Sequence, residues 1–233
     1  IRGLRDQKAT WRTEFVISCP MARDKDSMTL SAEHNSRGIE LADRGWFDEA
    51  VNEFKKAIEL DPNSTHAHEN LATVFTEKKK FKDALEEYLT ALRLEPDNPV
   101  AHYNLACFLS LNAAEFAIEE YKTAIELDPD YLDAHLDLGV SYGEVGQMDD
   151  GLRELKKAVE LDPSDPLPRH ELASLHEEMG DYRSAIHQLK EVVRLAPKNA
   201  DAWLDLGVCY AQKGFYAEAE KAYEQAQAQK GED

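Results

Sequence analysis

Prolines recur along this chain at an almost constant interval. Five of them lie 34, 33, 34 and 34 residues apart: Pro62, Pro96, Pro129, Pro163 and Pro197. Self-similarity with a period of 20 to 50 residues indicates a stack of like structural units, each of which buries its apolar face against its neighbours. The interval therefore predicts a repeat protein rather than one globular core.

Two columns of small residues keep the same period. One runs Gly38, Ala72, Ala106, Gly139, Ala173, Gly207, and the other runs Ala50, Ala84, Ala117, Gly151, Ala185, Ala219. The columns change phase between Ala106 and Ala117, so one residue is missing there. Ser31 to Asp233 spans 203 residues, which is six times 34 less one. We predict six units, at 31–64, 65–98, 99–131, 132–165, 166–199 and 200–233.

Each unit carries two helical patterns. In the fourth unit, one face of a first helix holds Leu138, Gly139 and Tyr142, and one face of a second holds Leu152, Leu155, Ala158 and Val159. The small columns would let the two helices approach closely. Between the patterns stand residues that tolerate positive φ, Gly45, Gly146, Gly180 and Gly214. Each proline then ends the second helix.

These residues resemble the tetratricopeptide repeat family. The fourth unit reads Leu138-Gly139, Tyr142, Gly146, Gly151, Leu155, Ala158, Pro163, and the sixth reads Trp203, Leu206-Gly207, Tyr210, Gly214, Ala219, Tyr223, Ala226. The resemblance covers 203 of the 233 residues. It implies an all-α fold, a right-handed superhelical solenoid of six helix-turn-helix hairpins with about 12 antiparallel helices. Because the family serves many partners, the resemblance specifies the fold better than the function.

Two units depart from the family pattern. The third has Asn112, Ala113, Ala114 and Glu115 where others have a glycine and an aromatic residue. Because it is one residue short, either its inter-helix turn is tightened or its first helix ends early. The fourth has Gly151 where the family prefers alanine, which costs its second helix on the order of 1 kcal/mol.

The two ends of the chain differ from the repeats. Residues 1–30 form an extension, read as a vector-encoded or upstream-translated stretch, as a capping helix with Leu4, Trp11 and Phe15 on one face, or as a segment that binds a neighbour's groove. The last helix, from about Ala217 to Lys230, is polar on the face where another repeat would dock, so we expect the array to stop there.

Charge and cysteine content limit the classes of partner. The net charge is −19, from 46 acidic and 27 basic residues, which disfavours nucleic acids and anionic membranes. No stretch approaches the roughly 18 apolar residues of a membrane-spanning helix. Cys19, Cys107 and Cys209 are too few and too scattered for a disulfide framework. We therefore expect a reducing, cytoplasmic location.

In the family, the first helix of each hairpin lines a concave groove that holds extended peptides. If this chain is alike, repeats one to three present Asn35, Ile39, Asn70, Thr73, Val100, Tyr103, Asn104, Cys107 and Leu111. Repeats four to six present Asp133, Asp137, Glu144, Glu171, Glu177, Glu178, Asp201 and Asp205. The second set is strongly acidic, which predicts a partner segment that bears lysine or arginine.

The family uses asparagines at one repeat position to hydrogen-bond a peptide backbone. In this chain only Asn70 and Asn104 are asparagines at that position, so we expect this role of these two residues alone. One subclass of the family grips the C-terminal carboxylate of heat-shock chaperones through lysine and arginine. At those positions this chain has Asn35, Ile39, Asn70, Val100 and Asn104. The cations are missing, so that partner is rejected.

Four histidines share one repeat position: His34, His68, His102 and His135. Because Trp203 fills the same position in the sixth unit, we interpret it as a packing site for flat rings. Equivalent helices lie at least roughly 8–10 Å apart, too far for their side chains to share one metal ion. His66 and His170 are expected to be exposed, where they could make binding sensitive to pH between roughly 5 and 8.

Motifs for catalysis and cofactor binding are missing from the sequence: it has no phosphate-binding glycine loop, nucleophile elbow or HExxH helix, and no histidine is placed to activate Cys107. No catalytic residue, cofactor or metal is predicted. The main hypothesis is an adaptor that binds a partner segment in its groove. The alternatives are a scaffold that self-assembles through Arg2, Arg5, Lys8 and Arg12, and the substrate-recruiting array of a larger enzyme.

Overall fold

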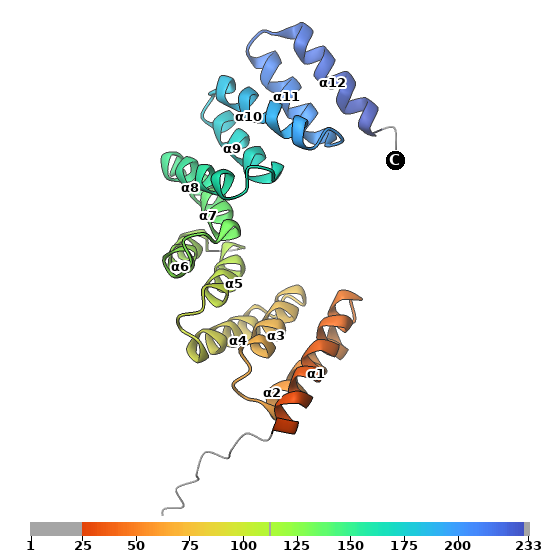
Figure 1. Ribbon diagram of the computed structural model, residues 1–233, viewed down its shortest axis with the longest axis vertical. Coiled ribbons are helices and arrows are strands. Elements are labelled where there is room, and N and C mark those ends of the chain that lie inside the picture. Colours follow the sequence, from red (N-terminus) through yellow and green to blue (C-terminus); the bar gives the residue numbers. More distant parts are fainter. Residues whose placement is uncertain (1–24, 112, 231–233) are drawn as a thin grey trace, which may run out of the picture.

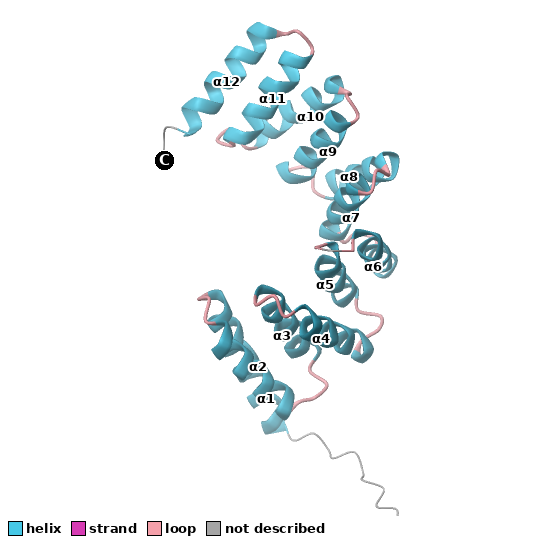
Figure 2. Ribbon diagram, turned by 180° about the vertical axis from the view of Figure 1, so that it is seen from behind, coloured by secondary structure: helices cyan, strands magenta, loops and turns pink. Residues whose placement is uncertain are grey.

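A computed structural model describes residues 25–111 and 113–230, which contain twelve α helices and no β strand (Figures 1 and 2). The helices are α1 (Lys25–Asp43), α2 (Phe47–Leu60), α3 (Thr65–Glu77), α4 (Phe81–Leu94), α5 (Pro99–Ser110), α6 (Ala114–Leu127), α7 (Leu132–Glu144), α8 (Met148–Leu161), α9 (Pro166–Glu178), α10 (Tyr182–Leu195), α11 (Ala200–Gln212) and α12 (Tyr216–Lys230). They form six consecutive hairpins, which confirms the predicted helical-hairpin array.

The hairpins stack in chain order into a curved solenoid. Each second helix packs against the first helix of its own hairpin, and those from α2 to α10 also pack against the first helix of the next hairpin. Figure 1 shows that the curve is open on its right-hand side, toward which α1 and α12 project from the two ends. Along the middle of the stack, α5, α7 and α9 lie on this open side and α6 and α8 lie behind them.

The first helix begins earlier than the repeat period predicts. It starts at Lys25 rather than Ser31, so residues 25–30 belong to the first hairpin. Ser27 Oγ donates a hydrogen bond of 2.9 Å to the Leu60 carbonyl, and Ser31 Oγ donates one of 2.8 Å to the Ala57 carbonyl. These bonds join α1 to α2. The proposed capping helix around Leu4, Trp11 and Phe15 lies outside the described residues.

Turn chemistry agrees with the sequence pattern. Each second helix from α2 to α10 ends two residues before one of the repeating prolines. Within hairpins, Gly45, Gly146, Gly180 and Gly214 have φ between +72° and +79°. In the second hairpin Lys79 takes this place at φ +57°, a region that is costly for a residue with a β carbon.

We expect Lys79→Gly to stabilise the protein by about 0.5–1 kcal/mol, because glycine adopts positive φ without the steric cost that lysine meets. Urea denaturation followed by circular dichroism measures the change. Lys79→Ala is the control, since it removes the side chain but keeps the β carbon. Equal stability of the two variants would count against backbone strain at this turn.

The third unit is one residue short because its first helix is one residue shorter. Helix α5 has 12 residues, whereas α3, α7, α9 and α11 have 13 each. The turn at 111–113 is as long as the turns at 78–80 and 145–147. The first helix therefore ends early, while the turn keeps its length.

Both small-residue columns are buried along their whole length. The fourth hairpin has glycine in both columns. A β carbon on Gly151 would lie 2.8 Å from the Gly139 carbonyl oxygen and 2.9 Å from Leu175 Cδ2. One on Gly139 would lie 2.6 Å from Leu155 Cγ. Glycine at 151 therefore permits α7 and α8 to pack closely, a role that helix propensity alone does not reveal.

Candidate functional site

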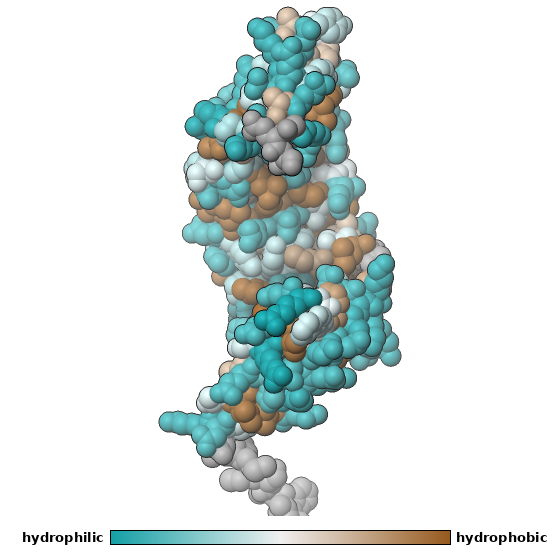
Figure 3. All heavy atoms as spheres, turned by 90° about the vertical axis from the view of Figure 1, so that its right-hand side faces the viewer, coloured by the Kyte–Doolittle hydropathy of each residue, from teal (hydrophilic) through white to brown (hydrophobic). Residues whose placement is uncertain are grey.

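The open side of the solenoid is lined by the first helices of the hairpins, as the family resemblance implied (Figure 1). Seen from this side in Figure 3, hydrophilic and apolar surfaces alternate along the molecule. We call this surface the concave face. The residues predicted to bind a partner all lie on these first helices, except Leu111, which directly follows α5.

Hydrogen bonds between successive first helices run along the concave face. Asn70 Nδ2 donates to Asn35 Oδ1 at 3.0 Å, and Asn104 Nδ2 donates to Glu69 Oε1 at 3.3 Å. Both asparagines that were assigned a peptide-binding role are thus oriented by contacts within the protein. Thr73 lies beside them, bonded to the Glu69 carbonyl and to Tyr88 OH. Ile39 is exposed.

At the middle of the concave face, Asp137 is less available than the sequence suggested. It is half-buried, and it accepts hydrogen bonds from Tyr103 OH at 2.8 Å and from Cys107 Sγ at 3.9 Å. Burial, and to a lesser extent the charge of Asp133, raise the pKa of Asp137 above its ordinary value, although the Tyr103 bond opposes this. Asp137 therefore helps to join α5 to α7 and is a poor candidate for direct charge recognition.

Cys107 has the properties of a half-buried structural thiol. Burial raises its pKa above the ordinary value, while bonds from Tyr121 and Tyr103 oppose the rise. The Tyr121 hydroxyl donates to its sulfur at 3.6 Å. A thiol with a raised pKa is a weak nucleophile at neutral pH.

The other predicted carboxylates fall into two groups. Several are engaged within the protein: Asp205 with His170 at 2.9 Å, Glu177 with Cys209 Sγ at 2.9 Å, and Asp201 with Lys230 at 3.4 Å. His170, expected to be exposed, is instead half-buried, and its bond to Asp205 raises its pKa. The second group, Asp133, Glu144, Glu171 and Glu178, forms no ion pair within the described residues.

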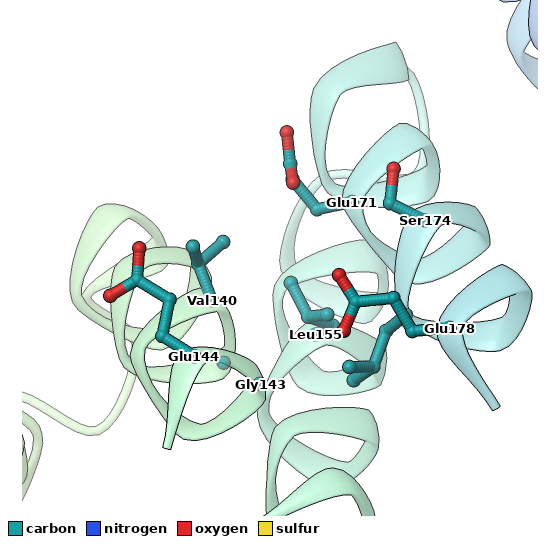
Figure 4. A pocket seen from close by; sticks show the side chains of 9 residues that line it. Val140, Gly143, Glu144, Leu155, Glu171, Ser174 and Glu178 are labelled. Carbon is teal, nitrogen blue, oxygen red and sulfur yellow. The ribbon is translucent and has the colours of Figure 1, made fainter. Parts of the chain in front are cut away.

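Three members of that second group surround a pocket between α7 and α9. Its floor is formed by Gly139, Val140, Gly143, Leu155 and Leu175, with Ser174 beside them, and Glu144, Glu171 and Glu178 complete its lining. In Figure 4, Glu144 extends from one helix and Glu171 and Glu178 from the other, with Val140 and Leu155 between them. The lack of a side chain at Gly139 and Gly143 lets Leu155 and Leu175 pack closely against α7 at this floor. We call this site the α7–α9 pocket.

A second hollow adjoins the α7–α9 pocket on the α5 side. Its lining includes Cys107, Leu111, Tyr121 and Asp137, and it shares Val140 and Glu144 with the α7–α9 pocket. The two hollows therefore lie next to each other along α5, α7 and α9. Four of the eight acidic residues predicted from sequence line these two hollows: Asp137, Glu144, Glu171 and Glu178.

Apolar residues of the C-terminal half were missed by sequence reasoning. Leu167, Leu204 and Val208 are large, exposed and carried by the first helices α9 and α11. The repeat period contained the signal, because the column of Ile39, Thr73 and Cys107 continues through Val140 and Ser174 to Val208. The concave face is therefore mixed acidic and apolar in its C-terminal half as well.

The described residues hold neither a candidate metal-binding cluster nor a helix that could span a membrane. No cluster of three or more histidine, cysteine, aspartate or glutamate residues there could hold a metal ion. Across the same residues, no helix has both the length and the apolar character needed to cross a membrane.

Comparison with known structures agrees with this architecture. The chain superposes on PilW, a type IV pilus biogenesis factor, with a TM-score of 0.76 and 23% identity, over 85% of this chain and 92% of that one. It superposes on pilF of Pseudomonas aeruginosa with a TM-score of 0.72 and 23% identity, over 88% of this chain and 99% of that one. It also superposes on YrrB, which is described as having an unusual peptide-binding site. The TM-score is 0.59 and the identity 21%, over 72% of this chain and 88% of that one. At these identities the likeness shows the fold alone. No protein of curated function matches the chain.

Family models account for most of the sequence. A model described as TPR repeat matches residues 38–77, 72–107 and 108–146, and two described as tetratricopeptide repeat match residues 132–165 and 170–233. Together with the six hairpins, these matches show that the chain belongs to the tetratricopeptide repeat family.

Proposed function

We propose that this protein is a non-catalytic interaction scaffold that binds an extended or helical segment of another protein on its concave face, and that the segment carries lysine or arginine. The observation that carries the proposal is the α7–α9 pocket, with its apolar floor and three carboxylates that form no ion pair with any described residue. A family relative in fold, YrrB, is described as having a peptide-binding site. The free thiols of Cys107 and Cys209 fit the cytoplasmic location expected from sequence.

The α7–α9 pocket suits the two-part chemistry of a basic side chain. Lysine and arginine have an apolar stem and a charged end. The stem would contact Val140, Leu155 and Leu175, and the charged end would reach Glu144, Glu171 or Glu178. Apolar side chains of the same segment would then contact exposed residues such as Leu111, Leu167 and Leu204. Clustered carboxylates would also speed the encounter with a cationic partner.

Charge removal at the pocket tests the proposal. The probe is a fluorescently labelled peptide that alternates leucine with arginine, compared with the same peptide in which glutamine replaces arginine. We expect Glu171→Gln with Glu178→Gln to weaken binding of the arginine peptide about tenfold, or about 1.4 kcal/mol, and to reduce its salt dependence. Asp137 and Asp205 are unsuitable targets, because Tyr103 and His170 bind them.

The matched control removes the same charge elsewhere. Glu126 and Glu160 are exposed on the second helices α6 and α8, away from the concave face. The Glu126→Gln, Glu160→Gln protein should bind as the wild type does. Equal weakening by both double variants would show that only net charge matters, and no weakening by either would refute a basic partner at this pocket.

The two alternatives remain proposals of lower rank. Self-assembly would use Arg2, Arg5, Lys8 and Arg12, which lie outside the described residues. Size measurement with and without residues 1–24 tests it, since a monomer in both forms would exclude it. The third proposal, that the array recruits substrate for a larger enzyme, is tested by the sequence that flanks this chain.

A further inference from the structure

In repeats two to four, the shared histidine position is a clamp between repeats as well as a packing site. The Nδ1 atoms of His68, His102 and His135 lie 2.6, 2.7 and 2.7 Å from Oε2 of Glu87, Glu120 and Glu154. Their Nε2 atoms lie 3.3, 3.0 and 3.1 Å from the carbonyl oxygens of Pro62, Pro96 and Pro129. Each ring thus joins three elements: the first helix, the second helix of its own hairpin, and the loop from the preceding hairpin.

Both partners of each ring are hydrogen-bond acceptors at neutral pH. A carboxylate and a peptide carbonyl can only accept, whereas a neutral imidazole has one N–H and one lone pair. A neutral ring would therefore set a lone pair against an oxygen on one of its two sides. The doubly protonated ring donates to both, so each clamp is complete only while it holds its extra proton.

The rings are well shielded, with side chains 9%, 11% and 6% exposed for His68, His102 and His135. The bond to Glu87 is the main cause that raises the pKa of His68 above its ordinary value. For His135, burial acts to lower the pKa, but the bonds to Glu154 and Pro129 outweigh it and the net shift is upward. These two rings therefore keep their protons to a higher pH than a free histidine does.

Other charged groups near the clamps are held elsewhere. Lys157 on α8 opposes the charge of His135, but it forms an ion pair of 3.5 Å with Asp130 in the adjoining loop. The loop carboxylates beside the three clamps bond to other groups: Asp61 to the Asn63 amide, Glu95 to Thr65 Oγ1 and Asn98 Nδ2, and Asp128 to the Asp130 amide. The glutamate on the second helix is thus the anionic partner of each ring.

The last two hairpins replace the clamp with groups that do not titrate near neutral pH. In the fifth, Arg169 takes the histidine position and its Nη1 donates to Gln188 Oε1 at 3.3 Å. In the sixth, Trp203 Nε1 donates to the Pro197 carbonyl at 2.9 Å, and Ala222 stands where the other repeats have the glutamate. Trp203 and Ala222 there line an open hollow between α10, α11 and α12.

We infer that the protons on His68 and His135 lock repeats two and four each to the repeat before it, so that rising pH loosens the solenoid at these two junctions more than in its last two hairpins, which lack the clamp. A group whose folded-state pKa is raised stabilises fully below its unfolded value, near 6.5, and loses this effect as the pH rises through the folded value. The same helices carry Asn70 and Asp137, so loosening changes the spacing of the concave face. The inference does not depend on which ligand binds there.

Hydrogen exchange of the whole chain, read by mass spectrometry at pH 6 and pH 8 and corrected for the intrinsic pH dependence of exchange, tests the inference. All proteins carry His170→Gln, because the bond to Asp205 raises the pKa of His170 as well. Protection in residues 65–161 should fall about tenfold more between the two pH values than protection in residues 166–230.

Two variants decide whether the rings cause this loss. His68→Gln, His102→Gln and His135→Gln together should abolish the difference between the two regions, whereas His187→Gln, at an exposed histidine of α10, should preserve it. If the triple variant does not fold, His135→Arg with Glu154→Gln copies the pair of the fifth repeat and should abolish the pH response at the α6–α7 junction alone. Equal loss in both regions of the parent protein, or an unchanged response in the folded variants, would overturn the inference.

Discussion

Leu155→Ala should lower the free energy of unfolding by about 2–5 kcal/mol, because the substitution leaves a cavity that the surrounding helices cannot close. Leu155 is only 1% exposed, and it packs in a core cluster with Leu136, Ala158, Leu172 and Leu175. These residues come from α7, α8 and α9, so the cavity would lie where the fourth repeat meets the fifth. In a solenoid each repeat is stabilised mainly by its neighbours, so loss of this contact weakens the coupling of the two halves.

Urea denaturation followed by circular dichroism measures this loss, and Leu152→Ala is the matched control. Leu152 lies on the same helix and is only partly buried, so its truncation should cost about 1 kcal/mol, in proportion to the smaller apolar area it removes from water. Similar losses of stability for the two variants would mean that Leu155 is not the centre of the contact between the fourth and fifth repeats. Leu155 also forms part of the floor of the α7–α9 pocket, so binding is best compared well below the unfolding midpoint.

The sequence predicted the hairpins because their signals are local. A proline two residues after Leu60 cannot continue the helix, and a glycine such as Gly146 accepts the positive φ of the turn without steric cost. Such constraints act within a few residues, and the 34-residue period repeats them six times. The start of α1 could not be read in this way. Residues 25–30 belong to no repeat column, and their helix is held by bonds from Ser27 and Ser31 to α2, which only the packed structure reveals.

The sequence predicts which helix face carries each residue of the candidate site, but not which groups its side chain contacts. Helical periodicity places Asp137 and Asp205 on first helices, but their partners Tyr103 and His170 lie 34 and 35 residues earlier in the chain. Whether a carboxylate meets such a partner or solvent depends on the rotation between repeats and on side-chain rotamers, which the period does not determine. The histidine clamps show the same limit. The ring position was read as a packing site, while its bond to a proline carbonyl required the path of the preceding loop.

Gly151→Ala should destabilise the protein by about 1–3 kcal/mol, although helix propensity alone predicts a gain of about 1 kcal/mol. The added β carbon would lie 2.8 Å from the Gly139 carbonyl oxygen, and this oxygen belongs to the backbone of α7. Relief would require α7 and α8 to separate, because a carbonyl within a helix cannot rotate away without breaking its own hydrogen bond. Such a shift would also disturb Leu155, which packs against Gly139 in the same interface.

Gly143→Ala separates the steric effect from helix propensity. Gly143 is also helical, but a β carbon there would approach only Leu175 Cδ1, at 3.0 Å, and this methyl group is the end of a flexible side chain. Its substitution should therefore leave stability within about 1 kcal/mol of the wild type or raise it. Urea midpoints for the two single variants give the comparison. Stabilisation by Gly151→Ala would show that the two helices separate at little cost, and that the glycine is not needed for their close approach.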